Sequence, residues 1–164
     1  MYVRQYVFEW LFTNKDISLA YLEKSANEDF PSADAAYILG SFYLSDMPFG
    51  KDLKKADYYI TLAAKLNHPA AIKSIGDGYY SGDIREKDLI KALECYEKSA
   101  EMGYGPAQFN AGIVLLNNAK SKKGLKRAIF WLDKASKNSD DLNDMTKDAL
   151  KYKKDAEDKL QKHF

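Results

Sequence analysis

The amino-acid sequence predicts an all-α protein, a right-handed α/α solenoid in which helical hairpins recur every 36 residues. Three observations indicate this fold class. Gly40, Gly76 and Gly112 are 36 residues apart, and so are two sets of alanines, at 35, 71 and 107 and at 56, 92 and 128. The apolar residues around these positions recur with the spacing of a helix. Four prolines and nine glycines leave little room for the many tight turns of a β-sandwich.

The first helix of each repeat is expected around its glycine, in the similar segments ADAAYILGSFY, AIKSIGDGYY and AQFNAGIVLL. Ala35, Leu39 and Tyr43 recur every four residues, as on one face of a helix. The second helix is expected about sixteen residues later, in KKADYYITLAAK, IKALECYEKSAE and LKRAIFWLDKAS. A glycine inside a helix costs about 1 kcal/mol relative to alanine. Its recurrence therefore predicts that the two helices of each hairpin pack closely.

The two ends of the chain differ from the repeats between them. Residues 2–28 are expected to form a degenerate hairpin, because ISLAYLEKSA at 17–26 is similar to IKALECYEKSA at 90–100. Residues 142–163 predict one capping helix with charges around an apolar stripe; the stripe consists of Leu142, Met145, Ala149, Tyr152, Ala156 and Leu160. One repeat domain, 1–164, is therefore expected, with full repeats at 33–69, 70–106 and 107–138.

Apolar side chains extend most of the way round the expected N-terminal helix. Val3, Tyr6, Val7 and Trp10 form one stripe, and three further apolar residues, Phe8, Leu11 and Phe12, widen it. Two interpretations stay open. The helix packs under the 16–28 helix and the first full repeat, or it forms a surface for a partner or a second copy.

The repeats also carry a family resemblance. The second one, from Ala71 to Gly103, reads A-x-x-x-I-G-x-x-Y-x-x-G, then D-x-x-K-A-x-x-x-Y-x-K-S-A-x-x-G, and resembles the Sel-one-like repeat (SLR), a relative of the tetratricopeptide (TPR) repeats. The third repeat keeps Gly112 and Trp131 but has Gly124 where the other two have an aspartate. The resemblance implies TPR-like helical hairpins. It also implies a role in binding other proteins, as adaptors in signalling and in protein quality control do.

The glycine-rich stretch SIGDGYYSGD at 74–83 invites comparison with a phosphate-binding loop. Its spacing, G-x-G-x-x-x-G, matches neither the dinucleotide fingerprint nor the P-loop, and no Lys-Ser or Lys-Thr follows it. We expect helix and helix end here instead. Gly78 and Gly82 are then expected to tolerate alanine, and Gly76→Leu is expected to damage the packing severely.

Composition and charge exclude several function classes. The net charge of +1 provides no global attraction to nucleic acid or membrane, although residues 1–50 carry −4 and the remainder +5. No apolar run approaches the roughly 18 residues that span a membrane, and Arg4 and Glu9 interrupt the N-terminal apolar residues, which makes them a poor signal peptide. A single cysteine, Cys95, fits a reducing compartment. These features predict a cytoplasmic protein.

Candidates for catalysis are few. His68 lies in a turn between repeats and His163 near the end of the chain, neither with a partner at a defensible spacing. Cys95 takes the position of Tyr59 and Trp131 in the sister repeats, which predicts a packed, inert thiol. Metal-binding motifs are absent, and the acidic residues at 140–144 lack the rest of a calcium loop. We expect no enzyme, no cofactor and no metal.

The candidate binding site is the concave face that the first helices of such hairpins present. At 100° per residue, nine positions lie opposite the hairpin contact: Tyr37, Ser41, Leu44, Lys73, Asp77, Tyr80, Phe109, Ile113 and Leu116. Six of the nine are aromatic or aliphatic, more than a merely solvated face requires. Two alternatives stay open, since some of these side chains pack sideways on neighbouring helices or lie under the C-terminal helix.

The sequence thus predicts a module that binds another protein and acts as a monomer or weak dimer. For short bacterial members the resemblance implies adaptors or inhibitors, including immunity proteins that neutralise a cognate toxin. The alternative is a nucleic-acid-associated protein that uses the basic cluster at 120–127, which consists of Lys120, Lys122, Lys123, Lys126 and Arg127. No aromatic residue is interleaved with this cluster, which favours a solvated loop or an acidic protein partner.

Overall fold

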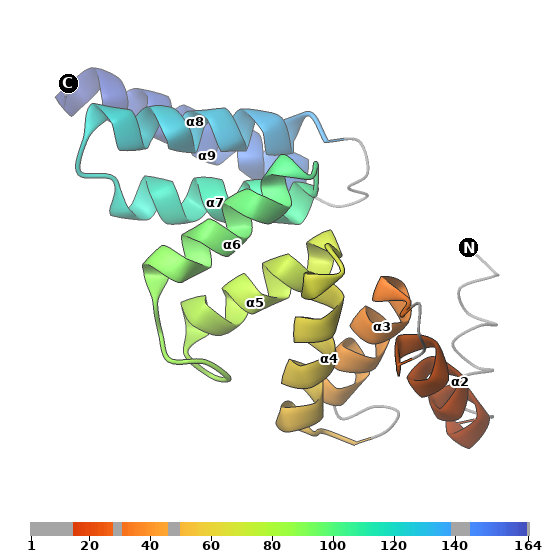
Figure 1. Ribbon diagram of the computed structural model, residues 1–164. Coiled ribbons are helices and arrows are strands. Elements are labelled where there is room, and N and C mark those ends of the chain that lie inside the picture. Colours follow the sequence, from red (N-terminus) through yellow and green to blue (C-terminus); the bar gives the residue numbers. More distant parts are fainter. Residues whose placement is uncertain (1–14, 28–30, 46–49, 139–144, 164) are drawn as a thin grey trace. The chain divides into compact units, whose positions relative to one another are not determined.

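The computed structural model describes residues 15–27, 31–45, 50–138 and 145–163, and every regular element within these ranges is an α-helix (Figure 1). The predicted all-α fold class is therefore confirmed. The described helices are α2 (Lys15–Asn27), α3 (Ala33–Leu44), α4 (Leu53–Lys65), α5 (Pro69–Ser81), α6 (Leu89–Glu101), α7 (Gly105–Asn118), α8 (Lys122–Ser136) and α9 (Met145–His163).

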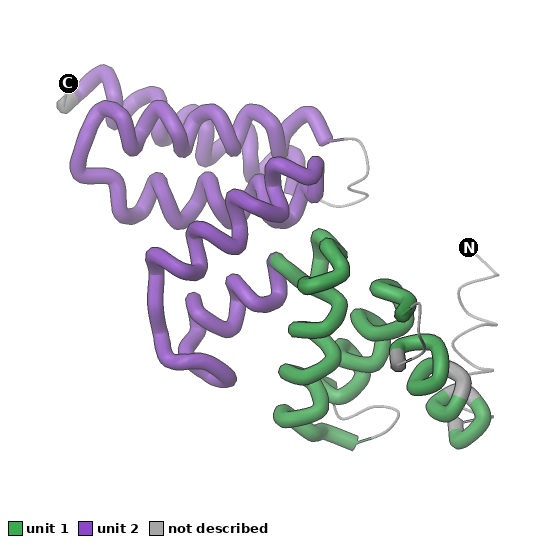
Figure 2. The backbone as a smooth tube through the Cα atoms, in the orientation of Figure 1, with its two compact units in different colours: residues 1–72 green, residues 73–164 purple. Residues whose placement is uncertain are grey.

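The chain divides into two compact units, residues 1–72 and residues 73–164, with the boundary inside α5 (Figure 2). In unit 1, α2 packs on α3, and α3 packs on α4 as the two helices of a hairpin. In unit 2, α7 and α8 form the corresponding hairpin, with α6 packed on α7 and α9 packed on α8. The single domain expected for 1–164 stays a prediction. The apolar N-terminal stripe and the first part of the 2–28 hairpin lie outside the described residues.

The repeated glycines lie where the two helices of a hairpin come closest. A Cβ on Gly40 would lie 2.5 Å from Ile60 Cγ1 of α4, and one on Gly112 would lie 2.6 Å from Leu132 Cγ of α8. A Cβ on Gly76 would lie 2.8 Å from the Tyr96 ring of α6. Three sister glycines thus face three sister residues across three hairpins, which confirms the close packing expected from the sequence.

The start of each second helix depends on a side chain that caps it. Asp52 and Asp88, 36 residues apart, each accept two backbone N–H bonds at 3.0 Å from the first turn of α4 and α6. In repeat three, Gly124 takes the place of these aspartates, and the Ser121 hydroxyl oxygen accepts from the Gly124 N–H at 3.2 Å instead. Because Ser121 precedes Gly124 by three residues, α8 begins about one turn earlier than its sisters.

The junctions between hairpins repeat as well. Asn67 (φ 61°) and Gly103 (φ 88°) both take the left-handed conformation directly after the last turn of a helix. The next residues, His68 and Tyr104, each donate a backbone N–H to a carbonyl five residues back, at 3.0 Å and 3.3 Å. This is the Schellman arrangement, which satisfies the last carbonyls of a helix.

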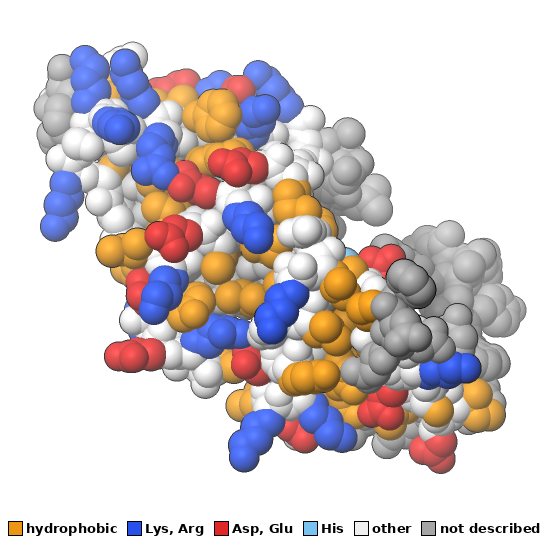
Figure 3. Space-filling view, in the orientation of Figure 1, with side chains coloured by type: hydrophobic (Ala, Val, Ile, Leu, Met, Phe, Trp, Pro, Cys, Tyr) orange, Lys and Arg blue, Asp and Glu red, His pale blue; other side chains and the backbone are white. Residues whose placement is uncertain are grey.

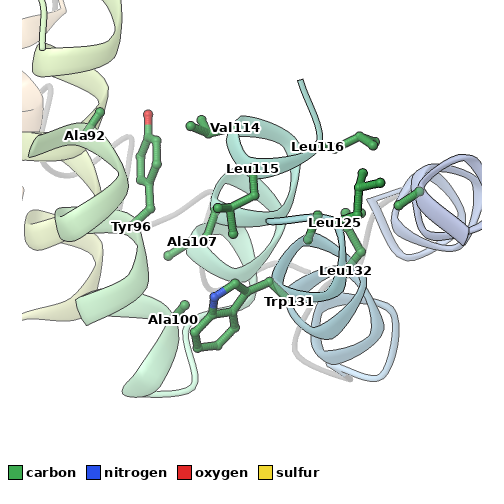
Figure 4. Packing of buried hydrophobic residues seen from close by; sticks show 13 residues of the cluster. Ala92, Tyr96, Ala100, Ala107, Val114, Leu115, Leu116, Leu125, Trp131 and Leu132 are labelled. Carbon is green, nitrogen blue, oxygen red and sulfur yellow. The ribbon is translucent and has the colours of Figure 1, made fainter. Parts of the chain in front are cut away.

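The core of unit 2 is one continuous cluster contributed by α6, α7, α8 and α9 (Figure 4). Tyr96 and Trp131 are its largest members, at 2% and 7% exposure, and Leu132 is fully buried. Helix α9 buries Ala149 and Ala156, and its Lys153 ammonium donates to Asp133 of α8 at 2.7 Å. The expected capping helix is present from residue 145 onward, and 142–144 lie outside the described residues.

The glycine-rich stretch is helical, as expected. Gly76 and Gly78 lie inside α5, and Gly82 follows its last residue with φ +86°. That left-handed φ makes the expected tolerance of Gly82→Ala wrong, because an L side chain is strained there. At Gly78 the new Cβ would lie 3.4 Å from Arg85 Cδ, an ordinary contact with a flexible side chain.

Candidate functional site

In unit 1 the predicted face contributes Tyr37, Ser41 and Leu44, all partly buried on α3. The Tyr37 ring stacks on the His68 imidazole, with ring centroids 4.4 Å apart and 22° between the planes. Tyr37 is therefore part of the packing at the end of its hairpin.

His68 has a structural position beneath Tyr37. Its Nδ1 accepts the Ala71 backbone N–H at 3.2 Å, as the Ser32 hydroxyl oxygen accepts from Ala35 one repeat earlier. Its Nε2 lies 3.3 Å from Asp34 Oδ1. An imidazole whose Nδ1 accepts carries its proton on Nε2, so it donates to the Asp34 carboxylate. His68 thus caps the start of α5, which accounts for its presence in the turn.

In unit 2 the structure brings four of the predicted residues together around one hollow of about 180 Å³. Asp77 and Tyr80 come from α5, and Phe109 and Ile113 come from α7. Tyr96, Asn110 and Val114 complete the lining. The helical spacing that placed these residues on one face therefore also placed them around one pocket.

The Asp77 carboxylate is the polar centre of this pocket. It accepts the Tyr96 hydroxyl at 2.9 Å and the Asn110 side-chain amide at 3.4 Å on Oδ1, and the Lys73 ammonium at 2.7 Å on Oδ2. Burial, together with the adjacent Asp77 charge, raises the pKa of Tyr96 far above its usual range. The Tyr96 hydroxyl therefore stays protonated and donates. Three donors fix the position of a carboxylate that is still 43% exposed.

The apolar side of the pocket is only partly covered. Tyr80 is 43% exposed. Phe109 is partly buried and meets the Tyr152 ring of α9 edge to face, with centroids 6.0 Å apart. Ile113 is partly buried as well. An aromatic and aliphatic rim around a fixed acceptor can take up an apolar side chain and hydrogen-bond a donor beside it.

Leu116 does not belong to this surface, and its inclusion in the predicted face is wrong. It is 5% exposed and belongs to the core cluster, where it points toward α9 (Figure 4). Helix α9 packs on both α7 and α8 and covers this end of the face.

Sequence reasoning missed Tyr96 and Asn110 as parts of the site. A signal was available for each. The sister residues of Tyr96 are Ile60 and Leu132, so its hydroxyl is a polar group at an otherwise apolar position. Asn110 takes the position held by Ser74 one repeat earlier, two residues before the hairpin glycine.

The other residues considered for catalysis are Cys95, which lies within α6, and His163, which lies at the end of a helix. Cys95 is half-buried, and burial raises the pKa of its thiol, which keeps it protonated and unreactive. His163 is the last residue of α9. Among the described residues no group of three His, Cys, Asp or Glu side chains could hold a metal ion. The acidic residues at 140–144 lie outside the described ranges.

The predicted basic cluster separates into two parts. Lys120, Lys122, Lys123 and Lys126 are exposed. Arg127 is engaged instead, because its guanidinium pairs with the Glu97 carboxylate of α6, which also accepts the Trp131 indole N–H at 3.0 Å. Within the described part of the chain, no helix has the length and apolar character that a membrane span requires.

Tandem helical hairpins with a small residue at each crossing define an α/α-repeat protein. The Sel1 repeat family model matches residues 9–30, 33–68, 69–104 and 105–140. The chain therefore belongs to the Sel1 repeat family, and the resemblance noted in the sequence is confirmed. Proteins of this family act as protein-interaction modules and are in general non-catalytic scaffolds.

Two solved structures are similar to this chain. A Sel1 repeat protein from Oxalobacter formigenes is 25% identical, with a TM-score of 0.68, over 81% of this chain and 96% of that one. The protein c5321, a protective antigen of uropathogenic Escherichia coli strains with an SLR fold, is 21% identical, with a TM-score of 0.69. This second match covers 90% of the present chain but only 33% of the E. coli protein, and it shows the fold alone. No curated protein matches the chain significantly.

Proposed function

We propose that this chain is a non-enzymatic module that binds another protein through the first-helix face of its repeats. The observation that carries the proposal is the pocket of unit 2, where Tyr80, Phe109 and Ile113 surround the fixed Asp77 carboxylate. Large aromatic side chains beside a positioned polar group are the kind of surface that supplies most of the energy in protein recognition.

The part of the face in unit 1 contributes less. Tyr37 already stacks on His68, so only one side of its ring remains for a partner. Ser41 and Leu44 are partly buried on the same helix. The unit 2 residues Lys73, Asp77, Tyr80, Phe109 and Ile113 are therefore the main contact region in this proposal.

More specifically, we propose a cytoplasmic bacterial adaptor or inhibitor, such as an immunity protein that neutralises a cognate toxin or effector. The sequence resemblance to short bacterial members supports this assignment, and the likeness to a Sel1 repeat protein of the bacterium Oxalobacter formigenes supports the bacterial source. The single cysteine fits a reducing compartment.

The proposal is tested by capturing the partner from the protein's own cell extract and measuring its affinity for two tyrosine variants. Tyr80→Ala is expected to cost about 2 kcal/mol or more in binding, because it removes a half-exposed aromatic ring from the pocket rim. The matched control is Tyr58→Ala, which removes a tyrosine on α4, away from the face, that is 57% exposed against 43% for Tyr80. If Tyr80→Ala binds as tightly as the control, the face is not the binding surface.

The nucleic-acid alternative predicts a different result. Charge reversal at Lys122, Lys123 and Lys126 would abolish binding to a nucleic acid, and the logarithm of affinity would fall steeply and linearly with the logarithm of salt concentration. With a protein partner bound at the pocket, the same reversal is expected to leave the affinity largely unchanged.

A further inference from the structure

Unit 2 has a second hollow, which shares only Val114 with the Asp77 pocket and has a volume of about 300 Å³. Leu89, Ile90 and Leu93 of α6 lie along it, together with Val114 and Leu115 of α7. Asn118 at the end of α7, Ala119, Lys120 and Ser121 of the α7–α8 connection, and Gly124 of α8 complete the lining. We call this hollow the α6–α8 groove. Its volume is at the lower end of the range of about 300–1,000 Å³ that is typical of ligand sites, which is room for one or two apolar side chains.

Ile90 is the most informative residue of the α6–α8 groove. It is 73% exposed, the highest value among the exposed large apolar residues of the described chain. Its sister residues in repeats one and three are Lys54 and Lys126. The repeat architecture therefore does not need an apolar residue at this position. An isoleucine that leaves most of its surface in water contributes little to folding, and its apolar surface is available to a partner.

The charge on the α7–α8 side of the α6–α8 groove has one sign, whereas the α6 side carries Glu94 and Asp88, and Asp88 caps α6 and pairs with Lys91. No Asp or Glu occurs between Glu101 and Asp133 in the sequence. The exposed lysines at 120, 122, 123 and 126 lie in or next to the α7–α8 connection, and none of them forms an ion pair with a carboxylate of the described residues. Figure 3 shows Lys and Arg side chains gathered over the end of unit 2 where α7 leads into α8, next to hydrophobic side chains over the start of α6.

Two of these lysines lie where they oppose helix formation. Lys122 and Lys123 are the first two residues of α8, which is capped by the uncharged Ser121, whereas the first-turn lysines Lys54 and Lys55 of α4 follow an aspartate cap. A positive side chain beside the positive end of a helix is unfavourable, and aspartates cap the sister helices α4 and α6 at this point. Helix stability therefore gives no reason for lysine here, whereas attraction of a carboxylate does.

We propose that the α6–α8 groove is a second protein-binding surface, which takes an acidic segment of another protein with a large apolar side chain among its carboxylates. The apolar side chain packs on Ile90 and Leu89, and the neighbouring carboxylates of the segment contact the lysines of the α7–α8 connection. This surface shares only the buried Val114 with the Asp77 pocket and does not depend on the function proposed above.

The test uses a random peptide library displayed on phage and selected on the immobilised full chain. Enriched peptides are expected to be rich in Asp and Glu around Leu, Ile, Phe or Trp. Their affinity is expected to fall about tenfold or more in Ile90→Lys, because the apolar contact of one isoleucine is lost. This variant carries the residue of the sister repeats, so it is expected to fold, and it adds positive charge. A loss of binding by acidic peptides can then only reflect the lost apolar contact.

Two further variants complete the test. The double variant Lys122→Glu, Lys123→Glu is expected to abolish binding of the same peptides, and Tyr80→Ala is expected to leave it unchanged. The inference is overturned if enriched peptides carry no excess of acidic residues, or if acidic peptides bind Ile90→Lys as well as the native chain. It is also overturned if a labelled single-stranded oligonucleotide binds this surface more tightly than the selected peptides.

Discussion

Two glycines of one helix are expected to respond to alanine in opposite directions. Gly76 and Gly78 both lie inside α5 and both are buried, but only Gly76 faces α6 at close range. We expect Gly76→Ala to destabilise unit 2 and Gly78→Ala to leave it unchanged or to stabilise it. Each variant controls for the other, because both replace a buried glycine of the same helix by alanine.

The magnitude follows from the distances. A Cβ at Gly76 would lie 2.8 Å from two ring carbons of Tyr96, whereas carbon atoms in good contact lie about 3.5–4.0 Å apart. The ring cannot swing away easily, because it is 2% exposed and its hydroxyl is bound to Asp77. Overpacking of this kind costs about 1–3 kcal/mol, and the better helix propensity of alanine returns about 1 kcal/mol.

The expected net loss for Gly76→Ala is therefore about 0–2 kcal/mol. At Gly78 the new Cβ meets only the flexible Arg85 side chain at 3.4 Å, so the gain in helix propensity, up to about 1 kcal/mol, remains. The two variants should differ by about 1–3 kcal/mol, because the gain in helix propensity is common to both and the overpacking is not.

Urea unfolding followed by tryptophan fluorescence measures this difference. The chain has two tryptophans, so a Trp10→Phe background leaves Trp131 of the unit 2 core as the only reporter. The midpoint concentration should fall for Gly76→Ala and hold or rise for Gly78→Ala, with unchanged slopes. Equal midpoints for the two variants would refute the reasoning that the hairpin crossing at Gly76 is closed by Tyr96.

Three further outcomes are expected. Trp131→Ala should cost about 3–5 kcal/mol in urea unfolding followed by circular dichroism, and a loss below about 1 kcal/mol would contradict its burial. Gly82→Ala should cost about 1–2 kcal/mol because of its φ of +86°, so an unchanged thermal midpoint would contradict the left-handed turn. Hydrogen bonds from Lys137 and Lys153 lower the pKa of Asp133, so its contribution to stability is present above the unfolded-state pKa and is lost as the pH falls through the lower folded-state value. Asp133→Asn should therefore reduce stability near neutral pH and have no effect in strong acid, and a constant difference across this range would count against the ion pairs.

The fold was predictable from the sequence because every repeat has a glycine where its two helices come closest. Gly40, Gly76 and Gly112 each face a sister residue on the second helix, and this constraint is visible as a spacing alone. The pocket in unit 2 was predictable for a related reason. Asp77 and Tyr80 follow from helical geometry on α5, and Phe109 and Ile113 follow from the same geometry on α7.

The residues whose surroundings were not predicted from the sequence depend on contacts or turns that the repeat pattern does not contain. Leu116 is buried because α9, which is not a repeat helix, packs over α7. Tyr37 packs on the ring of His68, which lies at the junction with the next repeat. The sister junctions have serine and tyrosine at that position. Gly82 takes a positive φ because the connection from α5 to α6 turns there, and backbone dihedrals of a single connection leave no periodic signal.

The junctions at Asn67 and Gly103 have a consequence for how such a chain can grow. At each junction a residue in the left-handed conformation ends one hairpin. The residue after it donates its backbone N–H to a carbonyl five residues back, and the next hairpin starts there. A second copy of residues 68–103 spliced in after Gly103 would therefore start and finish on backbone geometry that the chain already uses. Duplication of a gene segment of that length adds a whole hairpin, and no new turn has to evolve. The length of such a protein can therefore change in steps of 36 residues.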